Sequence, residues 1–156
     1  MDEPNANGKL ILLPKDSFKT ADFLRKKLQE KYKVKHLGVL IVDSRTIPLR
    51  VGVTGVALGY AGFRGIKDYR GTPDIFKRIF KSSHIDVANN LATAAVFTMG
   101  EGNEQQPLAI IKKASIEFCD KINRKELHMD IQDEMYLPLF SKLPKPALVY
   151  NMYNIW

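Results

Sequence analysis

Asp43 and Ser44 place a carboxylate and a hydroxyl side by side, directly after the aliphatic run Val39–Val42. A continuous β-branched and aliphatic run is typical of a strand buried on both faces. The strand is therefore expected to end at Val42 and to present the carboxylate at its end. Oxygen donors of this kind suit Mg²⁺ or Mn²⁺. Taken alone, the same pair is more often a simple turn.

Two other polar clusters could carry chemistry. Asp2, Glu3 and Asn5 lie near the start of the sequence, where a solvated terminus is the commoner explanation. The loop 100–106 carries Glu101 and Glu104 together with three amide side chains. It could hold a metal ion or a phosphate, or serve only as a solvated connector, and the residue types leave this choice open.

Phosphate binding is the second chemistry to consider, because the stretch 52–71 is rich in glycine. Its spacing matches neither the P-loop nor the dinucleotide-binding fingerprint. Arg50 and Arg70 are candidate phosphate contacts, although solvated surface charge explains both equally well. One cysteine, Cys119, excludes an internal disulfide, and three histidines form no zinc-binding spacing, so a metal would be bound by oxygen.

Composition narrows the class of protein. The chain has 156 residues, 45% of them hydrophobic, which suits one globular domain with a core. Its net charge of +7 indicates an anionic partner, but the basic residues are spread along the chain, so nucleic acid is an unlikely partner. The apolar runs are far shorter than the roughly 20 residues of a membrane span. The start also lacks a secretory signal, so we expect a cytoplasmic protein.

The elements that would position these residues alternate between strands and helices, which predicts a mixed α/β, or α+β, fold. Asp16 or Ser17 is expected to cap a helix whose apolar face contains Phe18, Ala21, Leu24 and Leu28. A second helix is expected from Asp86 to Met99, with Val87, Leu91, Ala94 and Thr98 on one face and Gly100 ending it. Extended segments are expected at Lys9–Leu13, Val51–Gly62 and Leu108–Ile111, and partial helix at Lys121–Met135.

Six stretches in the same order resemble the coenzyme F420-0:γ-glutamyl ligase family. The resemblance covers about residues 2–112, so we expect a domain at 1–112 and an extension at 113–156 packed on it. The stretches are Asp2–Asn5, Leu12–Asp16, Gly38–Ser44, Ala57–Gly62, Asp68–Gly71 and Met99–Glu101.

The resemblance implies a mixed α/β dimeric enzyme that uses GTP and a divalent metal to join L-glutamate to a phospholactyl deazaflavin. It also implies roles for individual residues. Asp2 and Asp43 would bind metal, and Ser44 and Glu101 would serve a second metal. Asn5 would contact GTP, and so would the loop residues Met99, Gly100, Gly102, Asn103, Glu104, Gln105 and Gln106.

The sequence departs from the family pattern in two ways. The amino-terminal part of the family fold is absent, so we expect the chain to need an amino-terminal partner half or a dimer for activity. Val51 and Gly55 stand where acidic residues are expected. The alternatives are a non-catalytic binding or assembly module, a ligase acting on another small acid, and a basic nucleic-acid-binding domain.

Overall fold

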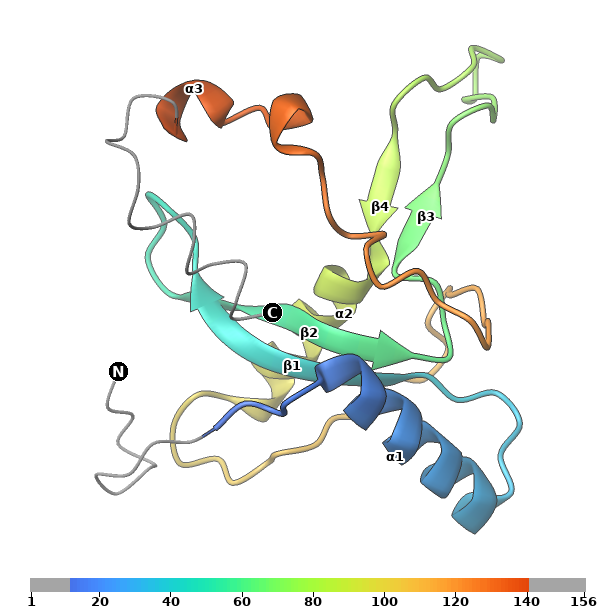
Figure 1. The fold of residues 1–156 in the computed structure, drawn as a ribbon, viewed down its shortest axis with the longest axis vertical. Helices are drawn as coiled ribbons and strands as arrows, with labels where there is room; N and C mark the ends of the chain where they lie inside the picture. The colour runs from blue at the N-terminus through green and yellow to red at the C-terminus, as the bar shows by residue number, and fades with distance from the viewer. Residues whose placement is uncertain (1–11, 141–156) are drawn as a thin grey trace. The chain divides into compact units, whose positions relative to one another are not determined.

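The computed structural model describes residues 12–140 (Figure 1). The chain divides into two compact units, Met1–Ile122 and Asn123–Trp156. This division lies ten residues beyond the domain boundary expected at 112. The first unit contains helices and two small antiparallel sheets, which confirms the mixed α+β prediction.

The central sheet consists of β1 (Val39–Thr46) and β2 (Val53–Ala61), paired antiparallel from Val39↔Ala61 to Thr46↔Val53. The extended segment expected around β2 is thus confirmed. The prediction that the strand beginning at Val39 ends at Val42 is wrong, because the pairing of β1 with β2 continues for four more residues. Residues 39–42 are also half-buried rather than buried, since the sheet has only two strands among residues 12–140.

Two helices begin at the residues that the sequence indicates, and the second also ends at the predicted glycine. α1 (Ser17–Tyr32) starts where the Asp16 carboxylate accepts a hydrogen bond from the Lys19 backbone N–H at 2.9 Å. α2 (Val87–Met99) starts at Asp86, which caps the Asn89 N–H at 2.9 Å. Gly100 ends α2 with a φ of 81°, a conformation that glycine adopts readily.

The two helices cover opposite faces of the β1–β2 sheet, with α1 in front and α2 behind in the view of Figure 1. Glycines in β2 permit both contacts. A Cβ at Gly59 would lie 2.6 Å from the Phe18 backbone nitrogen, and one at Gly55 would lie 2.8 Å from the Thr93 nitrogen and collide with the Ala92 carbonyl. Close backbone approach is therefore what these glycines provide.

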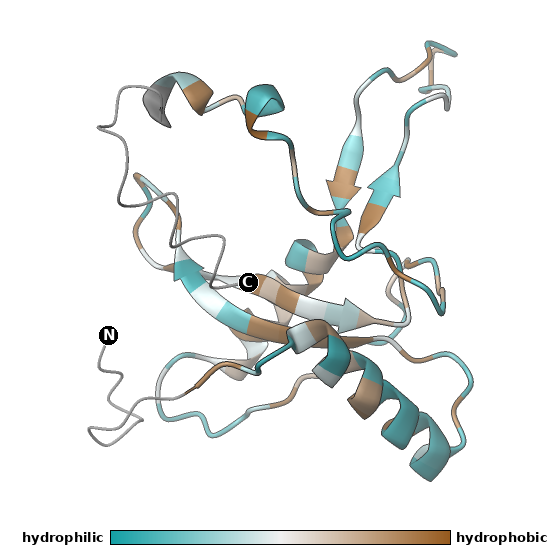
Figure 2. Ribbon diagram, viewed as in Figure 1, coloured by the Kyte–Doolittle hydropathy of each residue, from teal (hydrophilic) through white to brown (hydrophobic). Residues whose placement is uncertain are grey.

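The buried face of α2 lies about one position from the predicted one, whereas the buried face of α1 includes the predicted Ala21. In α1 the buried residues are Ala21 and Arg25, while Leu24 and Leu28 are partly exposed. Most of α1 is hydrophilic, as Figure 2 shows, although Phe23 is also exposed. In α2 the buried residues are Ala88, Ala92, Ala95 and Val96 rather than the predicted set. Small alanine side chains let α2 lie close to β2, so backbone approach outweighs side-chain size in choosing this face.

The core of the first unit centres on Tyr60 and Phe63, which are almost fully buried. The Tyr60 ring lies 5.3 Å from Phe18 and 5.1 Å from Phe63, measured between centroids. Arg25 is buried beside this cluster, where its Nε donates to the Leu37 carbonyl at 2.9 Å and its Nη2 pairs with Asp120 at 2.8 Å. Arg25 therefore links α1 to two distant segments of the chain.

A second hairpin, which we call the arm, spans residues 66–86. β3 (Ile66–Asp68) pairs antiparallel with β4 (His84–Asp86), and the arm extends away from the central sheet (Figure 1). The segment Ile75–Phe80 lies at the tip of the arm and is held by the isolated bridge Pro73↔Ile79 and by backbone hydrogen bonds across the arm.

Several weaker predictions fail or lie outside the described residues. Leu108–Ile111 forms no strand, and Lys121–Met135 is helical only at the 3₁₀ turn Ile131–Asp133 (η2). A short helix, α3 (Leu137–Phe140), follows in the second unit. Of the extended segment expected at Lys9–Leu13, Leu12 and Leu13 are not in a strand, and the other residues lie outside the described ones. Within residues 12–140, no helix is long and apolar enough to cross a membrane.

Candidate functional site: an oxygen-donor pair beside the loop after α2

Ser44 and Glu101 are brought together from positions 57 residues apart, with the serine Oγ donating to the glutamate Oε2 at 3.0 Å. Ser44 pairs with Gly55 across the β1–β2 ladder, and directly paired residues project to the same face of a sheet. That face is the one that α2 covers, as the contact of Gly55 with Ala92 requires. Glu101 follows the end of α2, so the position of this helix places the Glu101 carboxylate beside Ser44.

Asp43 is the next residue to this pair, but it projects to the opposite face because successive strand residues alternate. Its Oδ1 accepts a hydrogen bond from the Ser44 backbone N–H at 2.8 Å. Among residues 12–140, no three His, Cys, Asp or Glu side chains gather closely enough to hold a metal. Asp2, the other predicted metal ligand, lies outside the described residues.

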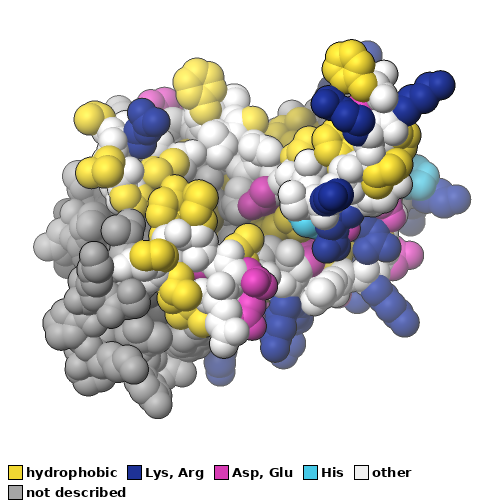
Figure 3. Space-filling view, turned by 90° about the horizontal axis from the view of Figure 1, so that it is seen from above, with side chains coloured by type: hydrophobic (Ala, Val, Ile, Leu, Met, Phe, Trp, Pro, Cys, Tyr) yellow, Lys and Arg dark blue, Asp and Glu magenta, His cyan; other side chains and the backbone are white. Residues whose placement is uncertain are grey.

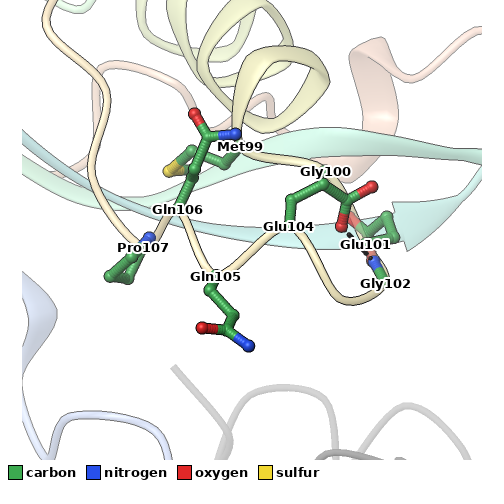
Figure 4. A pocket seen from close by; sticks show the side chains of 8 residues that line it. All are labelled: Met99, Gly100, Glu101, Gly102, Glu104, Gln105, Gln106 and Pro107. Atoms are coloured by element: carbon green, nitrogen blue, oxygen red, sulfur yellow. Dashed lines mark hydrogen bonds between the residues drawn. The ribbon is translucent and has the colours of Figure 1, made fainter.

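The predicted nucleotide loop lines a cavity of about 470 Å³ that is open to solvent (Figure 4). Its lining consists of Met99, Gly100, Glu101, Gly102, Glu104, Gln105, Gln106 and Pro107. Of the predicted loop contacts, only Asn103 does not line the cavity, and its Oδ1 accepts from the Gln105 amide at 3.2 Å. Asn5, the remaining predicted nucleotide contact, lies outside the described residues.

Glu104 gives the loop its shape. Its Oε2 accepts a hydrogen bond from the Gly102 N–H at 2.7 Å, the dashed line in Figure 4. The carboxylate packs directly against Gly100, where an added Cβ would collide with it. Gln105 and Gln106 point in different directions from the same strip of backbone (Figure 4). The loop thus combines a fixed turn with amide side chains that remain available for hydrogen bonds.

The two arginines predicted to contact phosphate lie elsewhere in the first unit. Arg50 is exposed in the turn between β1 and β2, where its N–H donates to the Ile47 carbonyl at 3.1 Å. Arg70 lies on the arm, and its guanidinium donates to both Asp68 oxygens at 2.7 to 3.1 Å. This pairing lowers the pKa of Asp68 to about 2. A phosphate at Arg70 would therefore compete with a carboxylate already in place.

The two missing acidic residues have different structural settings. Val51 is fully exposed in the β1–β2 turn, so an acidic side chain would fit there. Gly55 is covered by α2, and any side chain at this position would strike the Ala92 carbonyl. In this structure a carboxylate is thus excluded at position 55 unless α2 moves.

Sequence reasoning missed the two polar side chains that fix α2 to β2. The Asn89 Oδ1 accepts from the Ala57 N–H at 2.8 Å, and the Thr93 hydroxyl donates to the Gly55 carbonyl at 3.1 Å. The available signal was polar residues at i and i+4 on a helix otherwise rich in alanine. These contacts fix the first half of α2 to β2 and so set the direction of the helix that leads to Glu101.

Comparison with known proteins identifies the family of the chain. The family model described as F420-0:Gamma-glutamyl ligase matches residues 1–113. The chain is 36% identical over 133 residues to the coenzyme F420:L-glutamate ligase of Methanococcus maripaludis strain C7, covering 85% of this chain and 53% of that protein.

Two further relatives carry the same name. The identity is 36% over 118 residues with the Methanocaldococcus jannaschii protein, covering 76% of this chain and 47% of the relative. It is 38% over 113 residues with the Methanopyrus kandleri protein, covering 72% and 44%. The chain thus spans about half the length of these relatives. With the matching segment covering most of its own residues, the chain belongs to the F420-0:γ-glutamyl ligase family.

Proposed function

We propose that this chain supplies the metal- and nucleotide-binding part of a coenzyme F420-0:γ-glutamyl ligase. In this proposal the complete enzyme uses GTP and Mg²⁺ or Mn²⁺ to form an amide bond between L-glutamate and a phospholactyl deazaflavin. The observation that carries the proposal is the hydrogen bond between Ser44 and Glu101 beside the open loop, in a chain of this family. Because the chain spans about half of its relatives, turnover is assigned to the completed protein.

The donor set fits a hard divalent cation. Ser44 and Glu101 offer a hydroxyl and a carboxylate on the α2 face of the sheet, whereas the Asp43 carboxylate projects to the other face and would serve a separate ion. Mg²⁺ is commonly held by one or two protein carboxylates, with water and substrate phosphates completing its shell. The two oxygens of Ser44 and Glu101, with water and phosphate oxygens beside them, are therefore sufficient for such an ion. When bound with GTP, the metal would neutralise the phosphate charge on which phosphoryl transfer depends.

The loop residues have a matching role in binding the nucleotide. Glu104 keeps the turn at Gly100 and Gly102 in one shape, so the cavity needs little ordering when a ligand enters. Gln105 and Gln106 present amide groups that can both donate and accept hydrogen bonds, which suits the edges of a guanine base. We assign nucleotide contact to this loop and phosphate neutralisation to the metal beside it.

Calorimetric titration of the purified chain with GTP, with and without Mn²⁺, tests the proposal. We expect binding that depends on the metal and weakens about tenfold or more in Glu101→Gln and in Asp43→Ala, which is about 1.4 kcal/mol of binding free energy. Glu30→Gln, an exposed carboxylate on α1, is the matched control and should bind as wild type does. Equal affinities of wild type and Glu101→Gln for GTP with Mn²⁺ would show that Glu101 is not part of the binding site.

A second candidate function is a non-catalytic binding or assembly module that keeps the family fold. The contact of α2 with Gly55 favours it, because this packing excludes a carboxylate that the family pattern leads us to expect. Under this alternative the chain would still bind its ligand, but its complex with the rest of the ligase would not turn over GTP. Glutamate-dependent turnover by that complex would rule the alternative out.

A further inference from the structure

Large apolar side chains are exposed at both ends of the loop that lines the candidate site. Phe97 precedes the loop on α2 and is 89% exposed, while Leu108 and Ile110 follow it at 87% and 84%. Other large apolar side chains of the chain, such as Leu49 and Ile75, are equally exposed, so what distinguishes these three is their position on both sides of the loop. Each would be stabilised by burial against a partner. We call these three residues the loop-flanking surface.

The segment 107–111 has the composition of a strand but lacks a strand partner. Within residues 12–140, no backbone hydrogen bond joins it to another segment. Leu108 and Ile110 are two residues apart, so in an extended chain they would project to the same side. A strand-forming segment with free backbone groups and an apolar side is suited to pairing with an incoming strand.

The central sheet is also smaller than a stable sheet usually is. Among the described residues, β1 and β2 pair only with each other, so each has an outer edge without a strand. Isolated two-stranded sheets are marginal in water, and three or more strands with covering elements are usually needed. The described part of this chain thus has the character of a domain that is completed by further polypeptide.

We infer that the loop-flanking surface docks the portion of the ligase chain that these 156 residues do not span. The relatives supply the size of that partner, because the matched region is 53% of the Methanococcus maripaludis protein. A partner seated there would lie beside the loop 99–107 and close it from solvent. The inference deepens the proposed function and rests on it for the role of the loop, but docking itself requires neither GTP nor metal.

The arm exposes apolar side chains too, with Ile75 at 90% and Phe76 at 70%. Figure 3 shows hydrophobic and basic side chains gathered together on the side where the arm lies. The arm, however, carries its own internal contacts, including the Tyr69–Phe80 ring pair and the ion pair of Arg78 with Asp74. It therefore supplies a control surface that is equally exposed but does not adjoin the loop.

The test co-expresses this chain with the half of the Methanococcus maripaludis relative that it does not match, and measures their complex by sedimentation. We expect a one-to-one complex whose affinity falls about tenfold or more in the double variant Leu108→Ser, Ile110→Ser, the size of effect typical of interface anchors. The control double variant Ile75→Ser, Phe76→Ser on the arm should leave the complex intact. Equal losses in both variants, or no complex, would overturn the inference.

A single polypeptide that joins the two halves through a flexible linker covers the case in which the relative's half does not fold alone. There the Leu108→Ser, Ile110→Ser variant should lower the stability of the joined protein while leaving the thermal midpoint of the isolated chain unchanged. A lowered midpoint in the isolated chain would mean that these side chains are already buried, which overturns the inference. So would self-association of the isolated chain through the same residues, because the occupant would then be a second copy.

Failure of docking and failure of the proposed function are distinguishable. Glu101→Gln should weaken metal-dependent GTP binding about tenfold or more and leave the complex intact, since its carboxylate bonds within the chain. The Leu108→Ser, Ile110→Ser variant should weaken the complex and leave metal-dependent GTP binding by the isolated chain unchanged. If the complex forms normally but does not bind GTP, the proposed function is wrong while the docking surface is confirmed.

Discussion

Replacing Gly55 with alanine should destabilise the protein far more than one methyl group normally does. The new Cβ would collide with the Ala92 carbonyl and lie 2.5 Å from its carbon and 2.8 Å from the Thr93 nitrogen. These atoms are backbone atoms of α2, so no side-chain rotation relieves the contact. Overpacking in a rigid interior costs about 1–3 kcal/mol and occasionally more, and we place Gly55→Ala near the upper end because the whole helix must shift.

Chemical denaturation followed by circular dichroism measures this loss, and a thermal scan should show a midpoint lowered by roughly 6–12 °C for a chain of this size. Gly102→Ala is the matched control, because its nearest atom lies at an ordinary 3.4 Å and its φ is not in the left-handed region. The control should cost only a few tenths of a kcal/mol.

A second substitution tests the stated cause. Because the clash involves the Ala92 carbonyl rather than its methyl group, Ala92→Gly should not rescue Gly55→Ala. Rescue by this glycine, or a loss below about 0.5 kcal/mol for Gly55→Ala, would refute the claim that α2 lies against the backbone of β2. It would also reopen position 55 to the carboxylate expected from the family.

Three other substitutions test individual contacts. Arg25→Ala should cost about 2 kcal/mol in denaturant unfolding, because it leaves the Leu37 carbonyl without its charged donor; a loss no larger than that of a surface lysine would contradict this. Asn89→Ala should cost about 1–2 kcal/mol by removing the acceptor of a part-buried β2 amide, with faster hydrogen exchange at that amide as the diagnostic. Arg70→Ala should raise the pKa of Asp68 from about 2 towards 3.8 in a carboxyl NMR titration. Since the folded pKa is depressed, the stabilisation is present above pH 3.8 and is lost as the pH falls towards 2; an unchanged titration would show that another group lowers it.

Local signals in the sequence predicted the helix boundaries well. Asp16, Asp86 and Gly100 cap their helices as expected, because a cap depends on side chains within three or four residues. The buried helix faces were predicted less well. Hydrophobic spacing selects the larger residues, whereas α2 packs through alanines because β2 offers a glycine opposite them.

Strand predictions failed where a neighbouring strand determines whether a segment is paired. The first strand continues beyond its aliphatic run to Thr46 because β2 is long enough to pair with its polar half. Leu108–Ile111 has the residues of a strand and yet forms none, since no described segment pairs with it. Strand propensity reflects packing against neighbours, which a single sequence does not reveal.

The candidate site was predictable only in part. Asp43 drew attention as a carboxylate after an aliphatic run, but its neighbour Ser44 is the residue that meets Glu101. Their proximity depends on the placement of α2 over β2, a tertiary contact without a local signature. Only the resemblance to a family grouped these residues, and the roles that it implies for Asp2 and Asn5 stay predictions.

The central claim is best tested by turnover in the completed protein. The measurement is phosphate release from GTP by this chain in complex with the half that it does not span, with L-glutamate and the phospholactyl deazaflavin present and each omitted in turn. We expect release that requires both substrates and Mn²⁺ or Mg²⁺ and that falls about 100-fold or more in Glu101→Gln, comparable to the loss of one transition-state contact. A complex that sediments as expected but releases no phosphate, or one in which Glu101→Gln is as active as wild type, would contradict it.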